Sequence, residues 1–149
     1  MLAVTFAAYF VALWVAHEVA DHWAQTHHQA LTKGHRSRAG ARSCLMHVTT
    51  YTALTAALGG LVWVVLDLQI SLAGFVAGQL VSAVTHYWAD RRYTLAWLAD
   101  RLGKSRYYVL GAPRQGHDDN TTLGTGAYAL DQSWHHFWLF VAALIAALS

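Results

Sequence analysis

Four long apolar runs divide the chain, and each is close to the length of a helix that crosses a membrane. They cover residues 2–24, 44–66, 70–88 and 128–148. About 20 predominantly apolar residues are needed to cross the roughly 30 Å hydrocarbon core of a bilayer. Only 12% of the 149 residues are charged, against about 25% in soluble domains. The sequence therefore predicts one all-α domain over residues 1–149, an integral membrane four-helix bundle.

The basic residues predict how these runs are oriented in the membrane. All ten Lys and Arg fall within residues 25–43 and 91–126, while the termini and the connection near residue 67 carry none. Loops rich in Lys and Arg lie in the cytoplasm, so we place both blocks there and both termini outside. The charges are thus topology signals in a multi-pass protein whose partners are membrane lipids and not nucleic acid. A bundle of this size can also pair with a second copy of itself.

The segment after the third run has the pattern of a helix at the membrane surface. Residues 90–103 (DRRYTLAWLADRLG) form an amphipathic stretch, so we expect an interfacial helix there. Its membrane-facing residues would be Leu95, Trp97, Leu98 and Leu102. Residues 104–126 are rich in Gly, Asn and Asp, and we interpret them as a binding loop or a linker.

Ionisable residues interrupt the apolar runs in a repeated pattern. Three times a histidine and an aspartate stand four residues apart, and a further histidine lies near the start of the second run. Residues four apart share one face of an α-helix, so each pair directs an imidazole and a carboxylate the same way. Ionisable groups inside a membrane are costly and mark functional sites. These residues are His17 and Asp21, His47, His86 and Asp90, and Asp131 and His135.

The pattern predicts that the seven side chains meet in one layer. At a rise of about 1.5 Å per residue, the motifs all fall near the cytoplasmic ends of the runs. Imidazole and carboxylate are a ligand set for Zn²⁺, Mn²⁺ or non-haem iron, and helix bundles commonly hold such sites in their cores. Zinc usually takes four ligands, so seven candidates indicate either two ions or some residues that orient the ligands. The single cysteine excludes a multi-cysteine zinc site.

Neighbouring residues complete the candidate site. Gln25 and Gln132 are predicted to orient the metal-binding side chains. Asp21, Asp90 or Glu18 is the candidate general base, although Glu18 points about 100° away from its neighbouring pair and can equally form a contact on the helix surface. Two other interpretations stay open, namely a metal-free network of hydrogen bonds between helices and a pathway for protons or ions.

The motifs also carry a resemblance. The strings HEVADHWAQ (17–25), HYWAD (86–90) and DQSWHH (131–136), with the single His47, resemble a family of small bacterial and phage membrane proteins known as a domain of unknown function. The segment LGTGAYALDQSWH (123–135) is especially similar to the actinobacterial members. The resemblance implies roles for the seven residues and both glutamines, and a place in the bacterial inner membrane. Distantly similar four-helix membrane proteins are described as predicted metal-dependent hydrolases.

These observations favour a membrane-embedded, metal-dependent hydrolase acting on a lipid-linked or membrane-proximal substrate at the cytoplasmic face. The expected cofactor is one or two divalent ions, with zinc first and manganese or iron as alternatives. Arg91 and Arg92 either hold an anionic headgroup or anchor the protein at the interface.

The alternative function is a non-catalytic transporter of protons or metal ions. A transporter needs a polar route from the cluster to the outer surface. The outer halves of the runs are almost wholly apolar apart from Ser and Thr, which argues against such a route. A membrane di-iron oxygenase is disfavoured as well, because the chain lacks the HxxxH and HxxHH boxes of such enzymes.

Overall fold

Four long helices, three short ones and one turn of π-helix make up the described part of the chain. The computed structural model describes residues 1–119 and 124–149, and within them it contains no strand, which confirms the all-α prediction. Residues 120–123, which belong to the predicted loop 91–126 and include the first residue of LGTGAYALDQSWH, lie outside the described residues. The long helices are α1 (Leu2–Val19), α3 (Arg38–Val65), α4 (Leu72–Asp90) and α7 (Gly126–Ala147).

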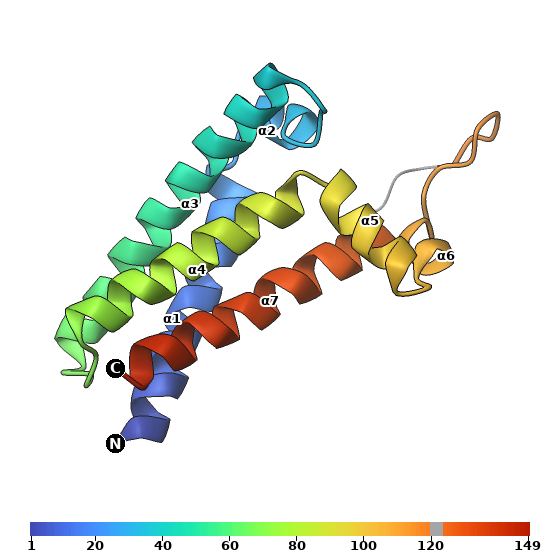
Figure 1. The fold of residues 1–149 in the computed structure, drawn as a ribbon. Coiled ribbons are helices and arrows are strands. Elements are labelled where there is room, and N and C mark those ends of the chain that lie inside the picture. The colour runs from blue at the N-terminus through green and yellow to red at the C-terminus, as the bar shows by residue number, and fades with distance from the viewer. Residues whose placement is uncertain (120–123) are drawn as a thin grey trace.

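The short elements gather at one end of the bundle. Both termini and the turn between α3 and α4 lie at the opposite end (Figure 1). The π-helix η1 continues α1 and leads to α2, whereas α5 and α6 follow α4 (Figure 1). These elements are η1 (Ala20–Ala24), α2 (His27–Thr32), α5 (Tyr93–Arg101) and α6 (Ser105–Tyr108).

Side-chain caps mark where four of the helices begin. Ser37, Ser71 and Thr125 each accept a hydrogen bond from a backbone N–H in the first turn of α3, α4 and α7. At α2, Thr26 and Gln29 form a reciprocal capping box. Such caps satisfy backbone donors that have no partner inside the helix and stabilise it by about 1 kcal/mol each. The longest helix, α3, starts at its cap and therefore extends N-terminally beyond the predicted span 44–66.

Small residues let the long helices approach closely. The GxxxG spacing of α4 faces α7, because a Cβ placed on Gly78 would lie 2.8 Å from the carbonyl oxygen of Ala142. A Cβ placed on Gly59 of α3 would likewise lie 2.9 Å from the ring of Tyr9. Around these contacts lies a core of aromatic, aliphatic and alanine side chains from the four long helices. At Gly78 the backbones of α4 and α7 thus approach directly, whereas Gly59 makes room for the Tyr9 ring.

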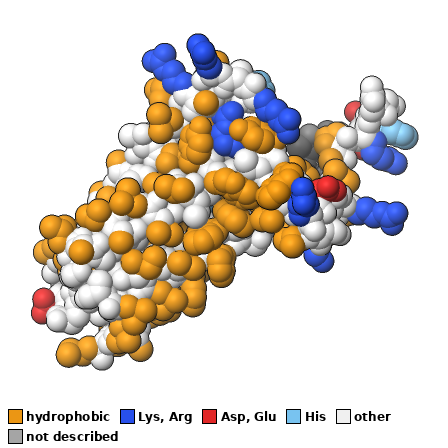
Figure 2. All heavy atoms as spheres, viewed as in Figure 1, with side chains coloured by type: hydrophobic (Ala, Val, Ile, Leu, Met, Phe, Trp, Pro, Cys, Tyr) orange, Lys and Arg blue, Asp and Glu red, His pale blue; other side chains and the backbone are white. Residues whose placement is uncertain are grey.

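Large hydrophobic side chains cover the outside of the bundle. Leu80, Val84 and Phe137 are more than half exposed, although they belong to the long helices. Figure 2 shows hydrophobic side chains along the bundle on the face drawn, with Lys and Arg gathered around its α2, α5 and α6 end. Two helical segments, Leu2–Ala24 and Arg38–Val65, are long and apolar enough to cross a membrane by length and composition. The helices α4 and α7, which correspond to the predicted third and fourth spans, do not meet that criterion.

The helix predicted to lie on the membrane surface is partly built into the bundle. It follows Arg92, whose φ of 56° turns the chain sharply out of α4. Leu95 and Ala99, four residues apart, are buried because α5 packs back against α4 and α7. Trp97 and Leu102 are exposed as expected. Leu95 is therefore a packing residue and not part of a membrane-facing surface.

Candidate metal centre

The predicted residues converge at the basic end of the bundle interior. His17, His47, His86 and His135 come from the four long helices, and each is at most 2% exposed. Asp90, the last residue of α4, is 1% exposed. The π-helical turn Ala20–Ala24 interrupts the α-helical pattern directly after α1 and carries the sixth residue, Asp21. Single π turns of this kind occur frequently at functional sites.

Four donor atoms form a compact cage. The Nε2 atoms of His47 and His86 lie 3.1 Å apart. Oδ1 of Asp21 lies 3.3 Å from the first nitrogen and 3.5 Å from the second. Oδ2 of Asp90 lies 3.2 and 3.3 Å from the same two nitrogens. A tetrahedral zinc ion with bonds of about 2.0–2.1 Å holds its ligands about 3.3–3.4 Å apart, and these five distances are close to that separation. Within the cage, His47, His86 and Asp90 form a grouping that could hold a metal ion.

Hydrogen bonds alone do not account for this arrangement. Oδ1 of Asp21 and Oδ2 of Asp90 are buried and accept no hydrogen bond in the described residues. One N–H bond points in one direction, so it cannot satisfy several convergent acceptors at once. A cation at the centre of the cage would satisfy all four donor atoms together. The donor set therefore fits a divalent metal ion, and the buried histidines and aspartates could hold one.

The other three predicted ligands adjoin the cage. Nε2 of His17 lies 3.6 Å from Oδ2 of Asp21, on the oxygen that the cage does not use. Nε2 of His135 lies 3.5 Å from Oδ1 of Asp131 and 3.8 Å from Oδ1 of Asp90. All seven residues thus form one connected group. The groupings His17, Asp21, His86 and His135, and Asp90, Asp131 and His135, could each hold an ion beside the first.

Aromatic packing fixes the orientation of the buried imidazoles. The ring of Tyr51 stacks on His86 with centroids 3.9 Å apart, and His86 and His135 stack at 4.1 Å. The Tyr51 hydroxyl shares a 2.6 Å hydrogen bond with Ser82 of α4, which holds the tyrosine in place. Ligands held in this way lose little rotational freedom when they bind an ion.

Lys33 is a member of the site that sequence reasoning missed. Its ammonium lies 2.7 Å from Oδ1 of Asp90, and the whole residue is 7% exposed. In the sequence Lys33 is only one charge of the basic block 25–43. Its partner is far away in the sequence, and no spacing pattern connects the two. The chain turns back on itself after α2, over residues 33–37, and only this fold-back brings the lysine over the end of α4.

Arg91 holds that fold-back in position. Its guanidinium donates to the carbonyl oxygens of Lys33 at 2.8 Å and His35 at 2.6 Å. The residue is 5% exposed. It is therefore unavailable to an anionic headgroup, and of the two predicted arginines only Arg92 remains accessible. Arg92 donates to the carbonyl oxygen of Ala30 at 2.7 Å.

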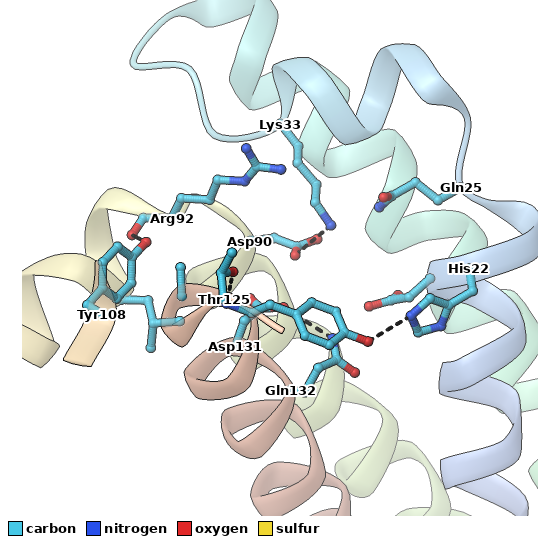
Figure 3. A pocket seen from close by; sticks show the side chains of 13 residues that line it. His22, Gln25, Lys33, Asp90, Arg92, Tyr108, Thr125, Asp131 and Gln132 are labelled. Atoms are coloured by element: carbon cyan, nitrogen blue, oxygen red, sulfur yellow. Dashed lines mark hydrogen bonds and ion pairs between the residues drawn. The ribbon is translucent and has the colours of Figure 1, made fainter. Parts of the chain in front are cut away.

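A cavity of about 530 Å³ connects the carboxylates to the basic end of the bundle. Figure 3 shows Lys33 reaching toward Asp90, with Arg92 beside it and Asp131 on the α7 side. The phenol of Tyr108 also lines the cavity, and burial raises its pKa above the ordinary value. The full lining is Asp21, His22, Gln25, Lys33, Asp90, Arg92, Leu95, Tyr108, Thr125, Ala127, Tyr128, Asp131 and Gln132.

The two predicted supporting glutamines both line this cavity but differ in their contacts. Gln132 donates to Oδ2 of Asp131 at 3.3 Å, which suits a role in orienting that carboxylate. Nε2 of Gln25 is buried and has no hydrogen-bond partner in the described residues. Glu18 lies outside the cavity, on the Nδ1 side of the His17 ring. In the loop, Asp119 pairs with Arg114 at 2.8 Å.

Buried polar side chains continue from the cluster toward the outer end of the bundle. Beyond the bond between Tyr51 and Ser82, Thr55 donates to the side chain of Gln79 at 2.8 Å. Gln79 in turn donates to the hydroxyl of Tyr9 at 3.2 Å. The outer halves were expected to be apolar apart from Ser and Thr, and Gln79 and Tyr9 correct that expectation.

The fold and the site define an all-helical protein with a buried histidine and aspartate cluster that could hold a metal ion. The chain belongs to the family described as a protein of unknown function (DUF3307), which matches residues 9–149. Searches of curated proteins and of solved structures find no match to it.

Proposed function

We propose that this protein is a four-span membrane protein that binds a divalent metal ion and hydrolyses a lipid-linked or membrane-proximal substrate at the cytoplasmic face. The observation that carries the proposal is the cage at the base of a cavity, in which two carboxylate oxygens each lie 3.2–3.5 Å from two imidazole nitrogens that are 3.1 Å apart. Zinc is the ion that fits this ligand set best, and manganese or iron would accept the same donors.

Several features support the membrane arrangement. Two helices are long and apolar enough to span, and the hydrophobic exterior continues over α4 and α7. The basic residues lie at the α2, α5 and α6 end, whereas both termini lie at the other end (Figures 1 and 2). Under the positive-inside rule this separation supports a cavity in the cytoplasmic leaflet of the inner membrane, with both termini outside.

The roles of the individual residues follow from their positions. A bound divalent ion would supply Lewis acidity, which polarises a carbonyl or phosphoryl oxygen and lowers the pKa of water toward about 7. Asp21 and Asp90 line the cavity. With His47, His86 and Asp90 as its three ligands, a zinc ion would keep a fourth position, on the Asp21 side, that water or a substrate can reach. Asp131 also faces the cavity and is not needed for the cage, which suits it to accept a proton from the attacking water.

With an ion bound, the cavity favours an anionic substrate. Lys33 and Arg92 place positive charges on its wall, and a divalent ion would outweigh the carboxylates of Asp21, Asp90 and Asp131 that also line it. The hydroxyl groups of Tyr128 and Thr125 stand on the α7 side. Arginine and lysine beside hydroxyl donors are the groups that bind phosphate oxygens. A phosphate-bearing headgroup at the membrane surface would enter here without leaving the leaflet. We therefore expect a lipid or lipid-linked phosphate ester as substrate.

The experiment that tests the proposal combines metal content with hydrolysis. The full chain purified in detergent is compared with His86→Ala, and with His117→Ala as a control at an exposed loop histidine. Elemental mass spectrometry gives the bound metal, and release of phosphate or headgroup from vesicles of anionic phospholipid gives the activity. We expect at least one equivalent of metal and measurable release in the wild type and the control, whereas His86→Ala should lose the cavity equivalent and the release. A wild type that stays metal-free after reconstitution would refute the metal centre. A metal-loaded wild type that hydrolyses none of the lipids would refute the reaction.

One observation favours a second candidate function, the transport of protons or metal ions. The buried chain of Tyr9, Gln79 and Thr55 extends polar contacts from the cluster toward the outer end. Intramembrane polar chains of this kind serve as proton relays in transporters. The candidate predicts metal-ion or proton flux in proteoliposomes that Gln79→Leu abolishes. The hydrolase predicts no flux, and the same variant retains hydrolytic activity.

A further inference from the structure

A second group of potential metal ligands lies outside the cavity, on the flank between α1 and α7. Glu18 is at its centre and is 46% exposed. Its Oε1 lies 3.7 Å from Nδ1 of His17 and 3.5 Å from Nε2 of His136. The donor atoms of His17, Glu18 and His136 all lie within 4.8 Å of one another. None of these three atoms belongs to the cage described above.

Two of these atoms are buried without a partner. Nδ1 of His17 and Nε2 of His136 both lack a hydrogen bond in the described residues, and His17 is fully buried. Most buried polar atoms in proteins are hydrogen-bonded, so two orphaned imidazole nitrogens beside one carboxylate call for a further partner. Both distances to Glu18 are too long for a hydrogen bond but close to the roughly 3.3–3.4 Å that separates two ligands of one zinc ion.

From this geometry we infer that His17, Glu18 and His136 form a second divalent-metal site on the flank of the bundle. Three protein ligands leave one coordination position open toward the exposed side of Glu18. Zinc is the matching ion, because two imidazoles and one carboxylate are donors that it accepts. The site goes beyond the proposed function, which uses only the donors that face the cavity.

Neighbouring residues hold Glu18 and His136 in place. Nδ1 of His22 lies 3.0 Å from the carbonyl oxygen of Glu18, and its Nε2 lies 3.1 Å from the hydroxyl of Tyr128. With Nδ1 donating to that carbonyl, His22 serves as a positioning residue beside the Glu18 carboxylate and not as a ligand. Trp14 packs edge-on against His136, with ring centroids 5.4 Å apart. The flank site therefore has its own supporting contacts on α1 and α7.

The His17 ring connects the two sites. Nδ1 faces Glu18, and Nε2 lies 3.6 Å from Oδ2 of Asp21. With an ion on Nδ1, the proton of the imidazole resides on Nε2 and is directed at Asp21. His17 would then orient the Asp21 carboxylate through the oxygen that the cage does not use, as carboxylate partners orient metal-bound histidines in other sites.

A zinc titration of the full chain in detergent tests the inference. Zinc alone is titrated against a chromophoric chelator for the wild type, Glu18→Gln, His136→Gln and the double variant. His28→Gln, at an exposed histidine of α2, is the matched control. We expect the wild type and the control to bind one more equivalent than the double variant. Each single variant should weaken that equivalent by more than about tenfold, because even partners of metal ligands cost 10–100-fold when lost.

The competing explanation is that Glu18 only orients His17 for an ion in the cavity. In that case His136→Gln retains every equivalent at wild-type affinity, and the inference is overturned. His47→Ala separates this failure from a failure of the proposed function, because it removes a cage ligand and leaves the flank donors intact. We expect it to lose the cavity equivalent and keep the flank one.

A second measurement does not depend on the ligand variants and can be made even if these fold poorly. Cobalt bound at His136 should quench the fluorescence of the adjacent Trp14 in the wild-type chain. Trp14→Phe identifies that contribution among the seven tryptophans. We expect the cobalt-dependent quenching to shrink clearly in Trp14→Phe. Equal quenching in both proteins would contradict an ion at His136.

Discussion

Replacing Lys33 with methionine tests whether the cluster is built to hold a cation. Lys33 and Asp90 are 2.7 Å apart, with side chains 9% and 1% exposed. At an effective dielectric constant of about 20, unit charges at that distance attract by about 6 kcal/mol, although the desolvation of both groups offsets much of it. Removal of one partner from a buried pair costs about 3–5 kcal/mol, because the other charge remains buried and uncompensated.

The size of this loss should depend on metal. Without divalent ions, we expect Lys33→Met to lower the free energy of unfolding by about 3–5 kcal/mol, which corresponds to a fall in the unfolding temperature on the order of 10 °C. With saturating zinc the ion compensates the charge of Asp90, so the difference between variant and wild type should shrink. A ligand that binds the folded state but not the unfolded state stabilises the folded state in this way.

The assay is thermal unfolding of the detergent-purified chain, followed by circular dichroism with and without zinc. Lys104→Met is the matched control, because Lys104 is exposed and belongs to the same class of basic loop residue. We expect the control to unfold like the wild type under both conditions. A Lys33→Met protein that is as stable as the wild type without metal would refute the reasoning, and so would a penalty that zinc leaves unchanged.

Two further predictions concern the packing of the helices and the loop. Gly78→Ala should destabilise the bundle by about 1–3 kcal/mol, because the added methyl would lie 2.8 Å from the Ala142 carbonyl oxygen. In Gly60→Ala the nearest neighbour of the methyl would be 4.0 Å away, so the free energy of unfolding should stay the same or rise by up to about 1 kcal/mol. Unfolding in detergent measures both variants. Hydrogen bonds from Arg114 lower the pKa of Asp119 below its ordinary value. The ion pair therefore stabilises the folded protein at a pH above the unfolded-state pKa of Asp119, and this stabilisation is lost as the pH falls through the folded-state pKa. NMR titration should show that midpoint rising toward the ordinary value in Arg114→Gln, and an unchanged midpoint would contradict the pairing.

The sequence was most informative where structure follows from local periodicity. The spacing of four between His86 and Asp90 requires a shared helix face, and the structure places both side chains against His47. The lengths of the apolar runs likewise indicated helices at 2–24 and 128–148, close to where they are observed. These inferences need only the helical repeat and the direction in which each run crosses the bundle.

The features that sequence reasoning missed depend on contacts between distant segments. Lys33 joins Asp90 only because the chain after α2 folds back and Arg91 ties it down by two carbonyl hydrogen bonds. Leu95 looked like a membrane-facing residue, yet the sharp turn at Arg92 directs it into the bundle. Neither the turn nor the fold-back has a signature in residue spacing, because both are set by tertiary packing.

The position of Asp90 at the end of α4 has an electrostatic consequence. The peptide dipoles of a helix sum to about half a negative charge at its C-terminus, where a carboxylate is disfavoured and a cation is favoured. Asp90 is the last residue of α4, so its own charge adds to that of the helix end. The terminus of α4 thus attracts positive charge whatever the geometry of the side chains around it. Lys33 compensates part of this negative charge, and a divalent ion in the cage would compensate the rest.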